Sequence, residues 1–188
     1  MKRGVLIIMA LFIFDICTAP VHDLRLRMLR LRSATEYAEK RFHELEFDRF
    51  INDLGYRESH NNWLCINSIG CFGEWQFSEK TLHHLGHRQI TLKKFLDNPD
   101  IFPRKMQAEV LRGLIKVNLS YLKRYEDFVG NTILDVVVTK PGMIAASHLG
   151  GAGSLIKFLK SGGEINRSDV LGTSVSDYLK YFSNYNIE

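Results

Sequence analysis

Apolar residues recur every three or four positions along most of the chain, which is the spacing of one face of an α-helix. The clearest stripe runs from about residue 38 to residue 56 and consists of Phe42, Leu45, Phe47, Phe50, Ile51 and Leu54. Glu58 lies four residues after Leu54 and therefore extends the same face. The pattern predicts a carboxyl group at a helix end in apolar surroundings, which favour its protonated form.

Further helices are predicted downstream, over residues 78–85, 92–96, 103–125, 142–148, 152–159 and 174–182. Thr91 can cap the second of these, and Ser174 with Asp177 resembles a capping box at the start of the last. Gly150 and Gly151 interrupt the helical pattern between residues 148 and 152. For the long helix 103–125 we expect a buried face made of Met106, Val110, Leu114, Val117, Tyr121 and Leu122.

Residues 133–138, Ile-Leu-Asp-Val-Val-Val, form the only β-like stretch, and six residues alone cannot make a sheet. A length of 188 residues gives room for one domain with a sizeable core. The pattern therefore predicts an all-α fold with little or no sheet, in a single domain over residues 38–188.

The first residues have the layout of a secretory signal peptide. Lys2 and Arg3 precede an apolar run over residues 5–14, and residues 17–19, Cys-Thr-Ala, offer small side chains at a cleavage site. The run is short for a bilayer span, which takes about 20 apolar residues. We expect residues 1–19 to direct export to the periplasm or cell envelope, with an uncleaved membrane anchor as the alternative.

Residues 20–37 are predicted to form a basic leader segment. Four arginines alternate there with leucines: Arg25, Arg27, Arg30 and Arg32. A nucleic-acid arm or a membrane-surface segment is one interpretation, and a solvated helix or linker is the one we favour. The net charge of +4 suits an anionic polymer, while 45% hydrophobic and 24% charged residues indicate an ordinary globular protein.

Without the predicted signal peptide the chain keeps two cysteines, Cys65 and Cys71. In an oxidising compartment they could pair and stiffen the loop between them, and otherwise they are two small thiols that fill space. Neither has the spacing of a metal ligand. The cluster of His83, His84 and His87 lacks acidic or cysteine partners, so we expect no metal and no cofactor, and no pattern points to nucleic acid.

A glycine-punctuated run follows Glu58 and Ser59, namely residues 68–77, Ser-Ile-Gly-Cys-Phe-Gly-Glu-Trp-Gln-Phe. One carboxyl group that faces a turn carrying a glutamine and aromatic residues suits cleavage of a bond between two sugars, because that reaction needs an acid to protonate the leaving oxygen.

Glu58-Ser59, residues 67–76 and Thr81 together resemble the signature of the soluble lytic transglycosylases, a family with a lysozyme-like fold. Residues 118–122, Asn-Leu-Ser-Tyr-Leu, and residues 146–150, Ala-Ser-His-Leu-Gly, resemble two further blocks of that family in the right order. The chain departs from the family pattern at several positions: Asn67 stands for a serine, Glu74-Trp75 for Leu-Met, and His148 for an asparagine.

The resemblance implies helices around a glycan-binding cleft and cleavage of the MurNAc–GlcNAc β-1,4 bond of peptidoglycan. Glu58 would act as general acid and then as base, while the sugar's own C6 hydroxyl closes a 1,6-anhydro ring. The resemblance also implies substrate-binding roles for Asn67 or Ser68, Gln76, Tyr121 and His148. Peptidoglycan strands would be the partner, and an envelope-spanning machine is a further candidate.

Two alternatives stay open from the sequence. Glu74 could be a second carboxylate, which would permit hydrolysis by water in the manner of a muramidase. The chain could also be a glycan-binding module that retained the fold without the activity.

Overall fold

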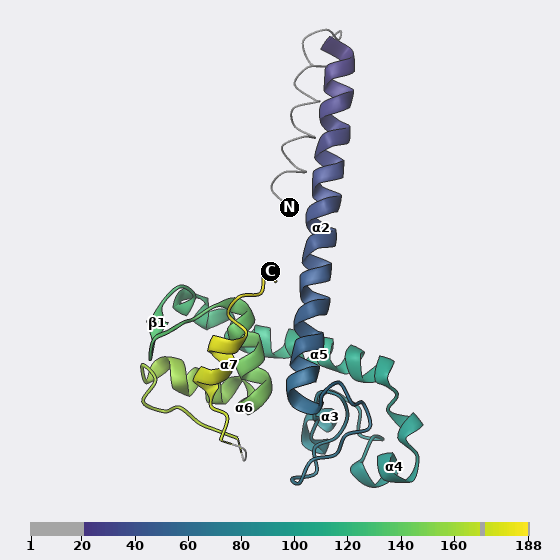
Figure 1. Ribbon diagram of the computed structural model, residues 1–188, viewed down its shortest axis with the longest axis vertical. Coiled ribbons are helices and arrows are strands. Elements are labelled where there is room, and N and C mark those ends of the chain that lie inside the picture. Colours follow the sequence, from purple (N-terminus) through teal and green to yellow (C-terminus); the bar gives the residue numbers. More distant parts are fainter. Residues whose placement is uncertain (1–20, 170–171, 188) are drawn as a thin grey trace. The chain divides into compact units, whose positions relative to one another are not determined.

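The structure, a computed structural model, describes residues 21–169 and 172–187 (Figure 1). The predicted signal peptide lies outside these residues. The chain divides into two compact units between Glu44 and Leu45, so the second unit begins somewhat later than the predicted domain start at residue 38. The all-α prediction is confirmed, because the described residues are mostly helical and the one sheet has two short strands. No helix in the described ranges is both long and apolar enough to cross a membrane.

Helix α2 spans Val21–Ser59 and carries Glu58 at its C-terminal end. The predicted stripe over residues 38–56 is thus only the second half of a longer helix. Beyond Ser59 the chain leaves the helix through His60 and Asn61, both with positive φ angles of 56° and 59°. The amide N–H groups of these two residues donate to the carbonyls of Tyr56 and Gly55, which satisfies the helix end as a C-terminal cap does.

A compact loop with short antiparallel bridges follows α2. Phe72 bridges both Ile66 and Phe77, so the glycine-punctuated run folds back on itself twice. Gly73 has a φ of +87°, and a Cβ atom there would lie 2.6 Å from Oε1 of Gln107, so only glycine fits.

Two short helices and a turn of 3-10 helix cover this loop: α3 (Glu79–His84), α4 (Leu92–Asp97) and η1 (Pro99–Ile101). Ser78 caps α3 and Thr91 caps α4, each accepting from a backbone N–H in the first turn. Both short helices therefore match the prediction to within a residue or two.

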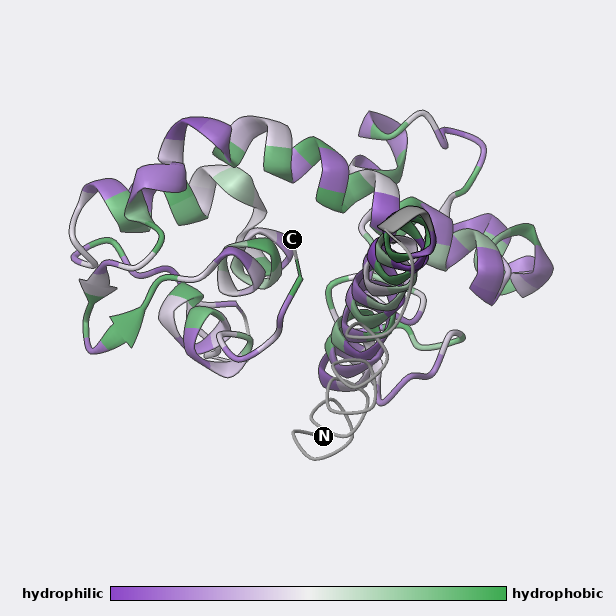
Figure 2. Cartoon of the chain, turned by 90° about the horizontal axis from the view of Figure 1, so that it is seen from above, coloured by the Kyte–Doolittle hydropathy of each residue, from purple (hydrophilic) through white to green (hydrophobic). Residues whose placement is uncertain are grey.

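Helix α5 spans Arg104–Leu122 and continues into the 3-10 helix η2, Lys123–Phe128. Of the six residues predicted to form the buried face of this helix, two are fully buried, three are half-buried and one is exposed. The buried residues are Gln107, Val110, Leu111, Ile115, Asn118 and Leu122. Tyr121, which was expected to be buried, is 54% exposed. The inner face contains two polar residues that the apolar pattern left out, and Figure 2 shows the more hydrophobic side of α5 turned toward α6.

The β-like stretch forms a hairpin. Strands β1 (Thr132–Ile133) and β2 (Val136–Val137) pair antiparallel through Leu134 and Asp135, whose φ angles of 48° and 61° match a two-residue turn of the primed type. Helix α6 (Lys140–Lys160) bends at Gly151, where φ is 74° and ψ is 158°, as the glycine pair predicted.

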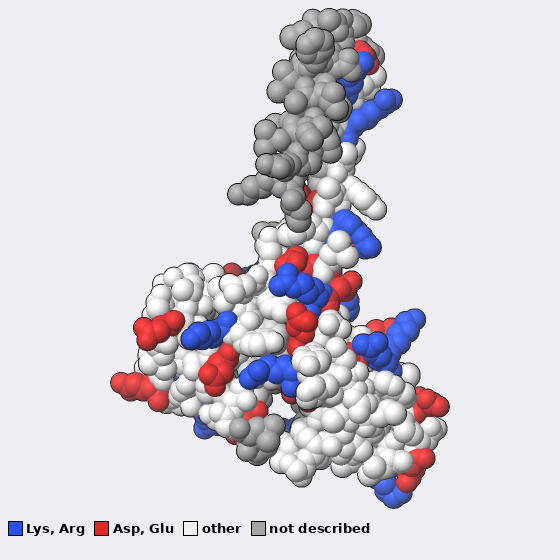
Figure 3. All heavy atoms as spheres, viewed as in Figure 1, with Lys and Arg blue, Asp and Glu red and all other residues white. Residues whose placement is uncertain are grey.

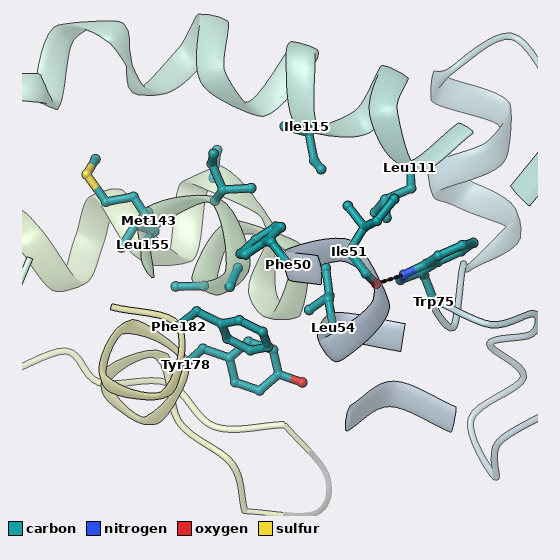
Figure 4. Packing of buried hydrophobic residues seen from close by; sticks show 14 of the residues in the cluster. Phe50, Ile51, Leu54, Trp75, Leu111, Ile115, Met143, Leu155, Tyr178 and Phe182 are labelled. Atoms are coloured by element: carbon teal, nitrogen blue, oxygen red, sulfur yellow. Dashed lines mark hydrogen bonds between the residues drawn. The ribbon is translucent and has the colours of Figure 1, made fainter. Parts of the chain in front are cut away.

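Helix α7 (Val175–Tyr181) begins with the predicted capping box of Ser174 and Asp177 and packs against α6. In Figure 4 the ring of Phe182 lies between Phe50 and Tyr178 in the core. The ring centroids of Phe50 and Phe182 are 5.4 Å apart, and their planes are close to perpendicular. On the other side of α2, Nε1 of Trp75 donates to the carbonyl of Ile51 over 2.8 Å. The end of α2 is therefore held from both sides.

The capping box makes stability depend on pH. Hydrogen bonds from Ser174 lower the pKa of Asp177, so its contribution is present above the unfolded pKa of about 3.9 and is lost as pH falls through the lower, folded pKa. We expect Asp177→Asn to lower the free energy of unfolding near pH 7 by about 0.5–1 kcal/mol. Denaturant titrations should show this loss fading below pH 4, whereas Asp127→Asn at an exposed position should change stability little at any pH. A loss that stays constant down to acid pH would contradict the assignment.

Candidate functional site

A cleft of about 380 Å³ lies beside Glu58 in the second unit. It is formed by the end of α2, the loop over residues 65–76, the middle of α6, and three residues from the C-terminal part, Asp169, Thr173 and Tyr178. Its lining residues are Arg57, Glu58, Cys65, Asn67, Ile69, Cys71, Gln76, His148, Leu149, Asp169, Thr173 and Tyr178. The structure thus gathers four of the predicted site residues, together with both cysteines, around one opening.

Glu58 is half-buried and is held by a tyrosine from the far end of the chain. The hydroxyl of Tyr178 donates to Oε1 of Glu58 over 2.6 Å. Figure 4 shows the Tyr178 ring packed beside Phe182, with its hydroxyl directed away from the core. Burial and then the neighbouring Glu58 charge raise the pKa of Tyr178 well above its ordinary value, so the phenol keeps its proton and remains a donor.

Arg57 covers the same tyrosine from the solvent side. Its guanidinium carbon lies 5.2 Å from the ring centroid of Tyr178 and 4.9 Å from that of Tyr181. These are distances of cation–π contact. The cleft therefore carries one guanidinium beside the carboxyl groups of Glu58 and Asp169, and this lining suits a strongly polar ligand.

Ser59 fixes the helix end to the loop that follows. Its hydroxyl donates to the carbonyl of Glu74 over 2.7 Å and accepts from the N–H of Asn62 over 3.0 Å. Because Glu58 precedes this anchored residue at the end of a helix, its backbone position is tightly constrained.

Asn67 lines the cleft, but its side-chain oxygen is already used by the loop. Oδ1 of Asn67 accepts from the N–H groups of Ile69 and Cys71 at 3.1 and 2.8 Å. Ser68 is exposed and does not line the cleft. Of the two candidates for one substrate-binding position, the structure therefore places only Asn67 at the opening.

Cys65 and Cys71 both face the cleft and are not bridged in the structure. The N–H of Gly73 donates to the carbonyl of Cys65, and the N–H of Asn67 donates to that of Cys71. The two cysteines therefore stand diagonally across a short antiparallel pair, which is wider than the directly opposite position. Burial raises the pKa of the Cys71 thiol.

Gln76 and His148 form the inner wall. Nε2 of Gln76 donates to the carbonyl of Gly73 over 2.7 Å, and Nε2 of His148 lies 2.9 Å from the carbonyl of Trp75. A carbonyl only accepts, so Nε2 of His148 carries a proton, and in the neutral ring Nδ1 is an acceptor. Oε1 of Gln76 and Nδ1 of His148 have no hydrogen-bond partner in the part of the chain that the structure describes.

Glu74 does not belong to this cleft. Its side chain is buried and makes a bidentate ion pair with Arg104. Nε of Arg104 lies 2.5 Å from Oε2 of Glu74, and Nη2 of Arg104 lies 2.9 Å from Oε1. Glu74 and Arg104 line a different hollow together with Asp48, Ile51, Asn52, Trp75, Lys105 and Ala108. The structure thus separates Glu74 from Glu58, and it leaves Tyr121 exposed on α5, outside the cleft.

Sequence reasoning missed four polar residues of the cleft: Tyr178, Asp169, Thr173 and Arg57. A signal for Tyr178 exists, because Val175, Tyr178, Leu179 and Phe182 form an apolar helical face in which the tyrosine alone carries a polar tip. Asp169 lies in an irregular segment and accepts from the N–H of Thr173 over 2.8 Å. Neither its position nor that of Arg57 follows from a periodic pattern.

No group of three or more His, Cys, Asp or Glu side chains that could hold a metal ion occurs among the described residues. No protein-family model, curated protein or solved structure matches the chain. Any function of this cleft therefore has to be inferred from the chemistry of its residues.

Substitution of the ion pair between Glu74 and Arg104 tests how much it stabilises the fold. Arg104→Met should leave the buried Glu74 carboxylate without a cation and lower the free energy of unfolding by about 2–4 kcal/mol. Adding Glu74→Gln removes that charge, so the double variant should recover part of the loss, which chemical denaturation would measure. A double variant less stable than Arg104→Met would contradict this account.

Proposed function

We propose that the chain is a peptidoglycan lytic transglycosylase with a lysozyme-like fold and that Glu58 is its catalytic acid. The observation that carries the proposal is a half-buried carboxyl group at a helix end. It accepts a hydrogen bond from Tyr178 and lines a cleft together with other polar side chains. Glycosidases use such an acid to protonate the oxygen of the leaving sugar.

In the proposed reaction Glu58 donates its proton to the glycosidic oxygen as the bond from C1 of MurNAc to that oxygen breaks. The C6 hydroxyl of the same MurNAc then attacks C1 and passes its proton to the Glu58 carboxylate. One bond to C1 breaks and one forms, no water is consumed, and Glu58 ends as it began. The nucleophile belongs to the substrate, so the reaction needs no second carboxylate.

The wall of the cleft suits the acetamido groups of such a strand. Oε1 of Gln76 and Nδ1 of His148 are acceptors without a partner among the described residues, and an acetamido N–H is a donor of the right kind. Arg57 at the rim matches the carboxylates of the lactyl and peptide parts of peptidoglycan. Both features favour an amino-sugar polymer with acidic substituents over a neutral glycan.

Hydrolysis is the second candidate, and a different residue now favours it. Asp169 lines the same cleft as Glu58, so it could direct a water molecule to C1. Glu74 is unsuited to this part because it is neutralised by Arg104 on the other side of the loop. The two reactions differ in their products, since ring closure yields fragments lighter by one water molecule than hydrolysis does.

Digestion of purified sacculi followed by mass spectrometry tests the proposal directly. We expect 1,6-anhydro muropeptides from the wild-type protein and a rate lower by at least about 10²-fold from Glu58→Gln, because the amide cannot donate the proton. Glu74→Gln is the matched control and should keep most of the activity.

Products with reducing ends that disappear in Asp169→Asn would establish hydrolysis instead. Equal inertness of the wild type and Glu58→Gln, with both still binding sacculi, would leave a glycan-binding module.

Tyr178→Phe should reveal the role of the hydroxyl on Glu58. Loss of the 2.6 Å hydrogen bond frees the carboxyl group to rotate, so we expect kcat to fall by about tenfold or more while KM changes little. Steady-state rates on soluble glycan strands would measure this. Tyr181→Phe, which also lies under Arg57 but has no bond to Glu58, should behave like the wild type.

A further inference from the structure

The N-terminal part of α2 carries an apolar stripe that the proposed enzyme chemistry does not use. Leu24, Leu31, Ala38 and Leu45 follow one another at intervals of seven residues, and Met28, Thr35 and Phe42 do the same four residues later. Within the continuous helix Val21–Ser59 these two rows form one seam, in which the first row has the spacing of the d positions of a coiled coil and the second row that of the a positions.

The seam is open to solvent at several places. Met28 is 68% exposed, Phe42 38% and Leu45 53%. A helix of this kind is marginal in water unless its apolar face is buried against a partner. The ion pairs Arg32–Glu36 and Arg41–Glu44 are local and exposed, and such pairs contribute little stability.

The charges beside the seam indicate the partner and its direction. The residues that follow the d positions are Arg25, Arg32, Glu39 and Glu46, two basic followed by two acidic. In an antiparallel pair of helices these positions face one another in opposite order. The two basic residues of one helix therefore lie opposite the two acidic residues of the other. With Thr35 packed on Ala38 of the partner subunit, Arg32 lies beside Glu39 of the partner subunit, and Arg25 lies beside Glu46 of the partner subunit.

The residues on the other side of the seam agree with this register. Arg27, Ala34, Arg41 and Asp48 precede the a positions. The same antiparallel alignment brings Arg27 beside Asp48 of the partner subunit, in exchange for the ion pairs that they make within their own chains with Asp23 and Arg112. It leaves Ala34 beside Arg41 of the partner subunit. A parallel pair would instead bring Arg32 beside Arg27 of the partner subunit, which is repulsive, and would keep one attractive pair, Arg41 with Glu46 of the partner subunit.

We propose that residues 24–48 of α2 are a self-association surface that pairs antiparallel with a second copy of this chain. Figure 3 shows both basic and acidic side chains along the visible side of α2, from its N-terminal end onward. This mixture of charges fits another copy better than an anionic surface, which would select basic residues along the whole segment.

Charge reversal at one pair of positions tests the partner and the direction together. Arg32→Glu places a carboxylate beside Glu39 of the partner subunit in the antiparallel dimer and should raise the dissociation constant by about tenfold or more. In a parallel dimer the same change would meet Arg27 of the partner subunit and tighten association. Sedimentation equilibrium of the purified full chain over a wide concentration range distinguishes these outcomes.

The complementary variants make the test independent of folding. Glu39→Arg alone should weaken association equally, while the double variant Arg32→Glu with Glu39→Arg should restore it. An equimolar mixture of the two single variants should form heterodimers. Arg30→Glu, on the outer side of the helix, is the matched control and should leave the dissociation constant unchanged.

Three results would overturn the proposal. A chain that stays monomeric at every concentration has no such surface, and one that Arg32→Glu tightens is not antiparallel. Binding to vesicles of anionic lipid, without self-association, would mean that the basic residues meet a membrane. None of these results bears on sacculus digestion, so the proposal and the enzymatic one fail separately.

Discussion

One buried carboxamide, that of Gln107 on α5, holds the loop on which the cleft depends. Its Oε1 accepts from the N–H of Glu74 over 2.6 Å, and its Nε2 donates to the carbonyls of Phe102 and Trp63 at 2.8 and 3.0 Å. Gln107 is fully buried, so each of these groups would lose its partner without access to water if the carboxamide were removed. The glycine at residue 73 lets the backbone come this close.

From this fixed loop the rest of the site follows. The carbonyl of Glu74 receives the Ser59 hydroxyl, which anchors the end of α2, and the carbonyl of Trp75 meets the His148 ring from α6. The Glu74 side chain points the other way and is neutralised by Arg104. One short peptide segment thus orients both walls of the cleft and removes a competing carboxylate from it.

Much of the fold could be predicted from residue patterns, because its helices have clear apolar faces and clear caps. The start of the last helix followed from Ser174 and Asp177, and the bend in α6 followed from Gly151. The inner face of α5 was predicted only in part, because its buried residues include Gln107 and Asn118, whose partners lie on other segments. Periodicity counts apolar side chains and has no access to such long-range hydrogen bonds.

The site was predicted in part for a similar reason. Glu58, Gln76, His148 and Asn67 share the cleft as expected, whereas Ser68, Tyr121 and Glu74 lie outside it. Tyr178 reaches Glu58 from 120 positions further along the chain, a contact that no local spacing encodes. Local sequence spacing indicated several of the residues that line the cleft, whereas contacts between segments far apart in the chain could not be predicted from it.

The hydrogen bond from Tyr178 makes the two oxygens of the Glu58 carboxyl group inequivalent. Because the phenol stays protonated, it remains a donor to Oε1, so the two oxygens of the resting carboxyl group have different surroundings. In the proposed reaction, Glu58 would therefore donate its proton from Oε2, the oxygen that Tyr178 leaves open. The direction of that proton transfer would then be set by a hydrogen bond that exists before any ligand enters.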